Sequence, residues 1–372
     1  MNVIFSDIIK EMQNIQECFL NFINEVELSD EKFQEIKQTI ENLIKANDSQ
    51  KIKLILHLIS KISNNTYRSE HFFDQIEKIL SLLTDTIINM FSNFSIFNIV
   101  KNNKRILLYF IEKKVITIDE SIAKIITSSK YQRYKYDIYF FPEIQNFISE
   151  QHKNKLIDWF KENPIDDFEK RRKDGENDSY ICSLIRNDSI DDFIIYVNQI
   201  NYSLSGYVPD SIFETNSYLF KYRANLIQYA AFFGSIQIFK YLLNNSISVD
   251  EQIFPYAAHS NSGELINSIE EMEIYPKVDT YLSMAINSMK CYHNEIAEYF
   301  ISYFDLEENL KNIYRKSLEY YNFQIMKPEI INNANLSYLC RYDYYYFVNL
   351  LLKNDNLDIN IQSKILKFIF VI

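Results

Sequence analysis

Apolar residues recur every three or four positions through the first 160 residues of the chain, which is the spacing of one face of an α-helix. In the first segment these positions are Phe5, Ile8, Ile9, Met12, Ile15, Phe19, Phe22 and Ile23. The same spacing predicts helices over 30–44, 48–62 and 69–83, with Ser, Asp or Asn residues suited to N-caps at their starts. Long helices with short connections predict an antiparallel helical array.

From residue 178 onward the predicted helices are shorter and come in pairs. The pairs are 180–185 with 190–197, 226–233 with 236–243, 253–258 with 264–269, 281–286 with 295–301, and 336–340 with 345–352. The clearest pair reads LIQYAAFFGSIQIFKYLL, in which Gly234 can end the first helix in the left-handed conformation. Ala231, Ala258 and Ala285 recur every 27 residues, which indicates a repeated helical hairpin.

A highly charged stretch, EKRRKDGEND at 169–178, separates these two regions. We interpret it as a solvated linker, which predicts a helical N-terminal domain at 1–168 and a repeat domain at 178–372. The alternative is that residues 170–173 (KRRK) form a nuclear localisation signal or an anion-binding patch. Acidic residues on both sides of this run favour the linker.

Composition narrows the class of protein further. Only 4 Gly and 6 Pro in 372 residues leave few of the turns that a sheet needs, so we predict an all-α chain. A net charge of -11 argues against a nucleic-acid partner. The four cysteines are far apart and form no CxxC motif, which is typical of a reducing compartment.

We expect neither a secretory signal nor a membrane-spanning segment from this sequence. Its first residues, MNVIFSDIIKEMQNIQ, place acidic side chains where a signal peptide has a basic and then an apolar region. No stretch approaches eighteen consecutive apolar residues. We therefore expect a cytoplasmic protein without a membrane span, with a nuclear location as the alternative.

The sequence offers no catalytic motif, cofactor loop or metal-ligand set. It lacks a glycine-rich phosphate loop, HExxH and GxSxG. Cys291 and His293 are the only close Cys/His pair, and two ligands do not complete a zinc site. The acidic pairs at 166–167 and 191–192 stand at predicted helix starts, where carboxylates cap free N–H groups. We therefore expect a non-enzyme without cofactor or metal.

Two aromatic runs, at 131–141 and 342–347, allow two interpretations. Aromatic rings interleaved with basic residues can stack on the bases of a single-stranded nucleic acid. Only the first run has such basic residues, namely Lys130, Arg133 and Lys135. Packing between helices is the favoured interpretation for both runs.

The second helices of the predicted pairs resemble the outer helix of ankyrin repeats, which has the form E-I-V-x-x-L-L. They read QIFKYLL at 237–243, ELINSIE at 264–270, EIAEYFI at 295–301 and YFVNLLL at 346–352. LDIN at 357–360 is similar to the tail that closes an ankyrin unit. The whole chain resembles the divergent ankyrin proteins that are abundant in some anaerobic protists, which carry an uncharacterised helical region ahead of the repeats. That leader is similar to the segments at 103–114, 140–147 and 175–189.

The chain departs from the ankyrin pattern in three respects. The T-P-L-H motif of the inner helix is absent. The 27-residue step is shorter than the ~33 residues of an ankyrin unit, which predicts shortened or missing loops between repeats. The last residues, KILKFIFVI at 364–372, are apolar where a further repeat should begin. We expect a truncated array there; a terminal helix that packs back on the array is the alternative.

The resemblance implies a non-catalytic scaffold or adaptor that binds a protein partner. The concave face of its repeats would be lined by Phe232, Phe233, His259 and Asn261, at the ends of the inner helices. One alternative places the interaction on the N-terminal helical region and leaves the repeats as structure. Another is an enzyme with an unfamiliar site, which would need polar residues from distant segments to converge in one pocket.

Overall fold

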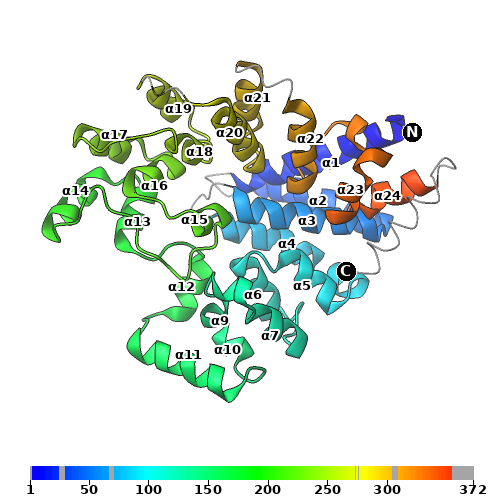
Figure 1. Ribbon diagram of the computed structural model, residues 1–372. Helices are drawn as coiled ribbons and strands as arrows, with labels where there is room; N and C mark the ends of the chain where they lie inside the picture. Colours follow the sequence, from blue (N-terminus) through cyan, green and yellow to red (C-terminus); the bar gives the residue numbers. More distant parts are fainter. Residues whose placement is uncertain are drawn as a thin grey trace. The chain divides into compact units, whose positions relative to one another are not determined.

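A computed structural model describes residues 2–24, 30–66, 71–272, 274, 276–303 and 309–353 (Figure 1). In this part of the chain the regular structure is helical, and no β-strand is formed. A single isolated antiparallel bridge joins Tyr207 to Asn225. The all-α prediction is therefore confirmed. Within the same residues, no helix is both long and apolar enough to cross a membrane. The predicted repeat tail at 357–360 and the apolar end at 364–372 lie outside the described residues.

The chain divides into two compact units. The first comprises Met1–Ile62, Thr66–Leu83 and Tyr275–Ile372, and the second comprises Ser63–Asn65 and Thr84–Ile274. The charged stretch expected to be a linker lies inside the second unit, where most of it forms helix α12 (Phe168–Asp174). The division into domains at 1–168 and 178–372 remains a prediction.

The first unit contains the long N-terminal helices and the last described helices of the chain. They are α1 (Asn2–Ile23), α2 (Asp30–Ala46), α3 (Ser49–Asn65), α4 (Phe72–Met90), α20 (Val278–Lys290), α21 (Asn294–Tyr303), α22 (Leu310–Tyr320), η2 (Pro328–Ile330), η3 (Asn333–Asn335), α23 (Leu336–Arg341) and α24 (Tyr345–Leu352). The last residues of α3, from Ser63, and of α4, from Thr84, belong to the second unit. The apolar face predicted for the first helix is buried along α1, from Phe5 to Ile23.

A buried polar contact joins α1 to the turn that follows α22. The Gln16 side chain is fully buried, and its Oε1 accepts a hydrogen bond from the backbone N–H of Phe323 at 2.7 Å. Its Nε2 donates to Asn322 Oδ1 at 3.3 Å, and Gln13 Nε2 donates to the Phe323 carbonyl at 2.8 Å. Because buried backbone groups need partners, these contacts fix the position of the turn on α1.

The second unit consists of shorter helices. They are α5 (Asn93–Val100), α6 (Lys104–Glu112), α7 (Glu120–Ile126), α8 (Ser129–Gln132), α9 (Tyr136–Tyr139), α10 (Phe141–Ile144), α11 (Glu150–Glu162), α12, α13 (Tyr180–Arg186), α14 (Ile190–Gln199), α15 (Ser217–Lys221), α16 (Leu226–Phe233), α17 (Ile236–Asn244), α18 (Ile253–Ala257) and α19 (Gly263–Glu270). The predicted aromatic segment at 131–141 spans α8, α9 and the start of α10.

Three helical hairpins of the second unit, α13/α14, α16/α17 and α18/α19, pack in succession (Figure 1). The first helices α13, α16 and α18 contact one another in that order, and α14 contacts α17. Asp188, in the turn of the first hairpin, accepts hydrogen bonds from the N–H groups of Gln237 and Ile238, each at 3.0 Å, and so caps α17. We call these three hairpins the hairpin stack.

The glycine turn predicted inside the second hairpin is confirmed. Gly234 has φ +69° and ends α16, whose first turn is fixed by a capping box between Asn225 and Gln228. A Cβ atom at position 234 would lie 3.3 Å from the Cβ of Ser260, in the next hairpin. The five predicted helix pairs are all present as helices, whereas their identity as ankyrin repeats stays a prediction.

The loops between hairpins differ in length. The chain from Gln199 to Leu226 is long, contains α15 and forms the bridge between Tyr207 and Asn225. This loop precedes Ala231 and so lies outside the 27-residue steps from which shortened loops were predicted. The connection from Asn244 to Ile253 is much shorter, as the 27-residue step predicts.

Candidate functional site

The four residues predicted to contact a partner lie at the ends of α16 and α18, and three of them are core residues. Phe232, Phe233 and His259 are 1%, 9% and 0% exposed. The His259 ring lies 4.7 Å from that of Phe232 and 4.2 Å from that of Tyr218, measured between centroids. Asn261 is exposed, in a turn with φ +53°. The rings of Phe232 and His259 pack against each other across two hairpins, so a partner would reach them only by separating these hairpins.

A hollow of about 420 Å³ opens between the segments that precede α16 and α18. Its lining includes Tyr207, Tyr222 and Arg223 from the first segment, together with Asp250 from the second and Tyr256 of α18. We call it the loop-edge hollow. Burial raises the pKa of Tyr256 to about 12, so this hydroxyl stays protonated near neutral pH.

Exposed aromatic rings and one guanidinium stand at the loop-edge hollow. Tyr207 is 55% and Tyr222 43% exposed. The Arg223 guanidinium lies 5.2 Å from the Tyr207 ring centroid, within cation–π range, and 3.8 Å from the Asp210 carboxylate. Tyrosine and arginine are enriched among the residues that dominate the energy of protein interfaces.

Backbone pairing holds the first wall of this hollow in place. The N–H of Val208 donates to the Ala224 carbonyl at 3.0 Å, and the N–H of Leu226 donates to the Gly206 carbonyl at 3.1 Å. The Tyr202 hydroxyl donates to the Tyr207 carbonyl at 2.9 Å. The exposed rings therefore stand on an ordered backbone, which lowers the entropy lost when a partner binds.

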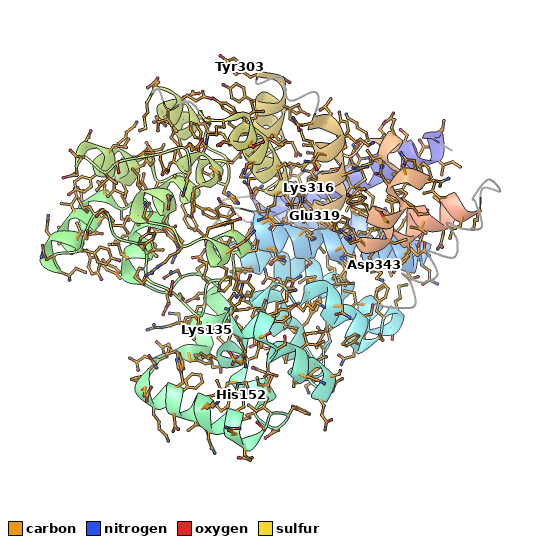
Figure 2. All side chains as sticks on the ribbon, viewed as in Figure 1. Lys135, His152, Tyr303, Lys316, Glu319 and Asp343 are labelled. Atoms are coloured by element: carbon orange, nitrogen blue, oxygen red, sulfur yellow. The ribbon has the colours of Figure 1, made fainter. Side chains whose placement is uncertain are left out.

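A second cavity, of about 440 Å³, shares Arg223 with the loop-edge hollow. Its apolar wall includes Trp159 of α11 and Phe220 of α15, and its rim includes Arg133 and Lys135 from the connection between α8 and α9. Lys135 is labelled in Figure 2. We call this cavity the Trp159 pocket. The fold thus brings the basic and aromatic run at 131–141 together with residues far along the sequence.

Two basic side chains at the Trp159 pocket lack a close acidic neighbour among the described residues. Within the part of the chain that the structure describes, no carboxylate lies within 4.0 Å of the side-chain nitrogens of Arg133 or Lys135. The pocket's acidic residues are Asp210, which faces Arg223, and Glu214, which is 6% exposed. The Glu214 carboxylate accepts hydrogen bonds from the N–H groups at 215 and 216, at 2.8 and 2.6 Å.

A buried lysine lies behind the pocket wall. Lys104 is 0% exposed, and its Nζ donates to the carbonyl of Ile212, a lining residue, at 2.8 Å. The same Nζ lies 4.1 Å from the Phe220 ring centroid and 5.4 Å from those of Tyr136 and Tyr139. Burial lowers the Lys104 pKa well below its ordinary value, although Glu214 and Asp137 oppose this effect. Sequence reasoning missed this residue, because a single lysine in an amphipathic helix gives no signal of burial.

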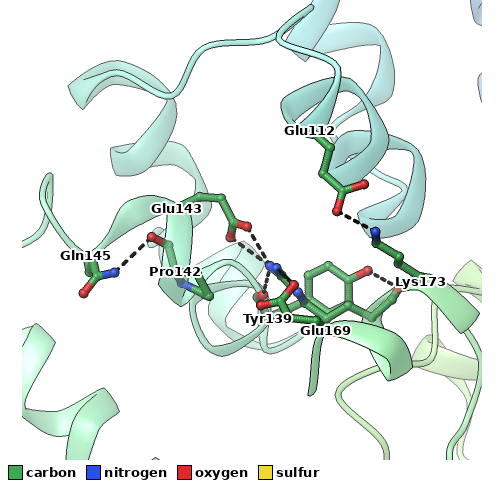
Figure 3. Close-up of polar contacts among 8 residues, drawn as sticks. Glu112, Tyr139, Pro142, Glu143, Gln145, Glu169 and Lys173 are labelled. Atoms are coloured by element: carbon green, nitrogen blue, oxygen red, sulfur yellow. Dashed lines mark hydrogen bonds and ion pairs between the residues drawn. The ribbon is translucent and has the colours of Figure 1, made fainter. Parts of the chain in front are cut away.

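The basic run at 170–173 is largely engaged in ion pairs (Figure 3). Arg172 is 2% exposed and donates to Glu143 at 2.8 and 2.9 Å, to the Tyr139 carbonyl at 3.1 Å and to Glu169. Lys173 pairs with Glu112 at 3.2 Å, and Arg171 pairs with Asp178 at 2.7 Å. The interpretation of this run as a solvated linker is therefore wrong for Arg172, whose charge is held inside the second unit.

Two other groups of polar residues bear on the candidate chemistry of the chain. In the described part of the chain, no three His, Cys, Asp or Glu side chains are grouped to hold a metal ion. Cys291 is buried, which raises its pKa to about 12 and keeps it a thiol rather than the thiolate that binds metals. In the first unit, His57 and Lys53 both contact Asp343, which is labelled in Figure 2, and so hold the turn between α23 and α24.

The second unit therefore offers two depressions that share the lining residue Arg223. Exposed tyrosines line the loop-edge hollow, and the Trp159 pocket is lined in part by Arg133 and Lys135, which have no carboxylate within 4.0 Å among the described residues. Their shared residue, Arg223, is exposed. Comparison of the chain with protein-family models, with curated proteins and with solved structures finds no match.

Proposed function

We propose that this protein is a non-catalytic scaffold that binds a protein partner at the loop-edge hollow. The observation that carries this proposal is the grouping of Tyr207, Tyr222 and Arg223 around one hollow on an ordered backbone. These side chains are exposed, although tyrosine and arginine are residue types that protein interfaces commonly bury.

The packing of the hairpin stack supports the same function. Successive hairpins bury the faces that they share, where the rings of Phe232 and His259 pack together. The edge formed by the loops before α16 and α18 stays open. Proteins built from stacked helical hairpins commonly bind partners on such extended surfaces. The binding site of this proposal therefore moves from the buried helix ends to the loops that precede α16 and α18.

The test uses substitutions in the full chain, because a truncation near residue 168 would cut through the second unit. The tagged protein is used to capture partners from its own cells, and each partner is quantified by mass spectrometry. We expect the Tyr207→Ala, Tyr222→Ala double variant to lose most of a specific partner. Tyr180→Ala is the matched control, because Tyr180 is 55% exposed on α13 and lies outside both depressions.

Two outcomes would contradict the proposal. One is that the double variant captures the same partners in the same amounts as the unsubstituted chain. The other is that Ile4→Ser, which changes an exposed residue of α1, loses the partner while the double variant keeps it. The second outcome would place the interaction on the N-terminal helices.

A further inference from the structure

The unpaired positive charge at the Trp159 pocket indicates what kind of partner would fit there. The chain as a whole carries a net charge of -11, yet Arg133 and Lys135 are exposed at one rim with no carboxylate of the described chain within 4.0 Å. Two basic side chains without a close acidic neighbour, beside one pocket, leave a local positive potential in which an anionic group is stabilised.

The pocket offers an apolar wall as well as this charge. Trp159, Leu219 and Phe220 line it, so a ligand that only carried negative charge would leave this surface unused. Arg223 belongs both to this pocket and to the loop-edge hollow. A ligand that fills the Trp159 pocket therefore offers an apolar group as well as acidic ones.

We propose that the Trp159 pocket binds an acidic peptide segment of the partner, with an apolar side chain against Trp159 and carboxylates beside Arg133 and Lys135. This assignment rests on the proposed function and adds the chemistry of the segment that is bound. The guanidinium of Arg133 can pair with a carboxylate through two parallel hydrogen bonds, whereas Lys135 acts as a point charge.

A single-stranded nucleic acid fits the same surface less well. Its backbone carries a negative charge at every nucleotide, and exposed carboxylates line both depressions, Asp210 in the Trp159 pocket and Asp250 in the loop-edge hollow. A phosphate beside either carboxylate would be repelled. A peptide can place uncharged residues at those points and acidic ones only beside Arg133 and Lys135.

Trp159 is the only tryptophan of the chain, so its fluorescence reports directly on this pocket. The full chain is titrated with a short peptide of glutamates around one central phenylalanine, and binding is followed by Trp159 emission and by calorimetry. The comparison probes are the same peptide with glutamine in place of glutamate, and a single-stranded oligothymidylate.

We expect saturable binding of the glutamate peptide with a change in Trp159 emission, and an affinity that falls as salt is added. Substituting both Arg133→Ser and Lys135→Ser should weaken this binding roughly tenfold or more. The matched control, Lys124→Ser with Lys170→Ser, removes two exposed lysines of the same unit outside the pocket and should leave the affinity unchanged.

The assignment is overturned by equal binding of the glutamine peptide, by tighter binding of the oligothymidylate, by no binding, or by calorimetric binding without a change at Trp159. Failure here is distinguishable from failure of the proposed function. If Tyr207→Ala with Tyr222→Ala still abolishes capture of a partner, the scaffold proposal stands and only the identity of the acidic segment is wrong.

Discussion

His57 and Asp343 are 286 positions apart in the sequence, and their side chains are joined at 2.9 Å between His57 Nε2 and Asp343 Oδ2. Lys53 Nζ lies 2.6 Å from the same carboxylate oxygen. The His57 ring stacks on that of Tyr321 with centroids 4.9 Å apart. Asp343 has φ +62° in the turn between α23 and α24, so the contact ties that turn to α3 within the first unit.

This pair predicts a pH dependence of stability with a definite sign. Burial lowers the His57 pKa from its ordinary 6.5, although Asp343 favours the charged ring. The unfolded chain therefore binds a proton more readily than the folded chain, and the free energy of unfolding falls as pH drops below about 6.5, by at most ~1.4 kcal/mol per pH unit. His57→Gln should reduce this loss, measured by urea denaturation between pH 7.5 and 5.

Asp343 contributes in a lower pH range. Burial alone would raise its pKa, but hydrogen bonds and charges from His57 and Lys53 lower it below 3.8. Its contribution to stability is present above pH 3.8 and is lost only as pH falls further.

An equal loss of stability in the His57→Gln variant between pH 7.5 and 5 would show that His57 is not the titrating group.

The buried Lys104 predicts that the stability of the chain depends on pH in the alkaline range. Its folded-state pKa lies well below the ordinary 10.5, so the unfolded chain binds the extra proton between the two values and stability rises with pH across that window. Relative to Lys104→Met, the unsubstituted chain should gain stability as the pH rises towards 10.5, by at most ~1.4 kcal/mol per pH unit. Buried tyrosines titrate equally in both proteins and cancel in the comparison. This account would be contradicted if the difference in the free energy of unfolding between the two proteins did not change with pH. It would also be contradicted if the exposed control Lys170→Met showed the same trend.

Gly234 predicts a backbone effect. At φ +69° a β-branched side chain is strained, and the added Cβ would also approach Ser260 at 3.3 Å. Gly234→Val should therefore lower the free energy of unfolding by roughly 2–3 kcal/mol. Gly234→Asn introduces a residue that tolerates this conformation and should cost less. Equal losses in the two variants would mean that steric crowding, and not the backbone angle, decides the effect.

Substitution of Gln16 should show how much one buried polar contact contributes to stability. Gln16→Leu removes the acceptor of the Phe323 N–H and leaves that group buried without a partner, which should destabilise the chain by roughly 1–3 kcal/mol. Gln38→Leu, on the exposed face of α2, is the control and should change stability by less than about 0.5 kcal/mol. Similar effects of the two substitutions in thermal or chemical denaturation would contradict the role assigned to Gln16.

The helices and the turn at Gly234 could be predicted because each depends on residues close together in the sequence. Amphipathic spacing identifies α1 without knowledge of its neighbours, and a glycine after an apolar run identifies the end of α16. The contacts of Gln16 with Phe323 and of His57 with Asp343 depend on how distant segments meet, and no local pattern records that.

The candidate site shows the same limit. The sequence indicated that Phe232 and His259 stand at helix ends, but which face of a short helix is covered depends on the next hairpin, and both are buried. Arg133 and Lys135 were noticed as basic residues among aromatic ones. Their position beside Trp159 and Phe220 follows only from the fold of the second unit.

Hydrogen–deuterium exchange of the full chain, free and bound to a captured partner, tests the central claim most directly. The account predicts that binding protects the backbone amides of 205–228 and 246–256, around the loop-edge hollow, and leaves the exchange of α1 and α2 unchanged. Protection confined to α1–α4, with no change at the loop-edge hollow, would contradict it.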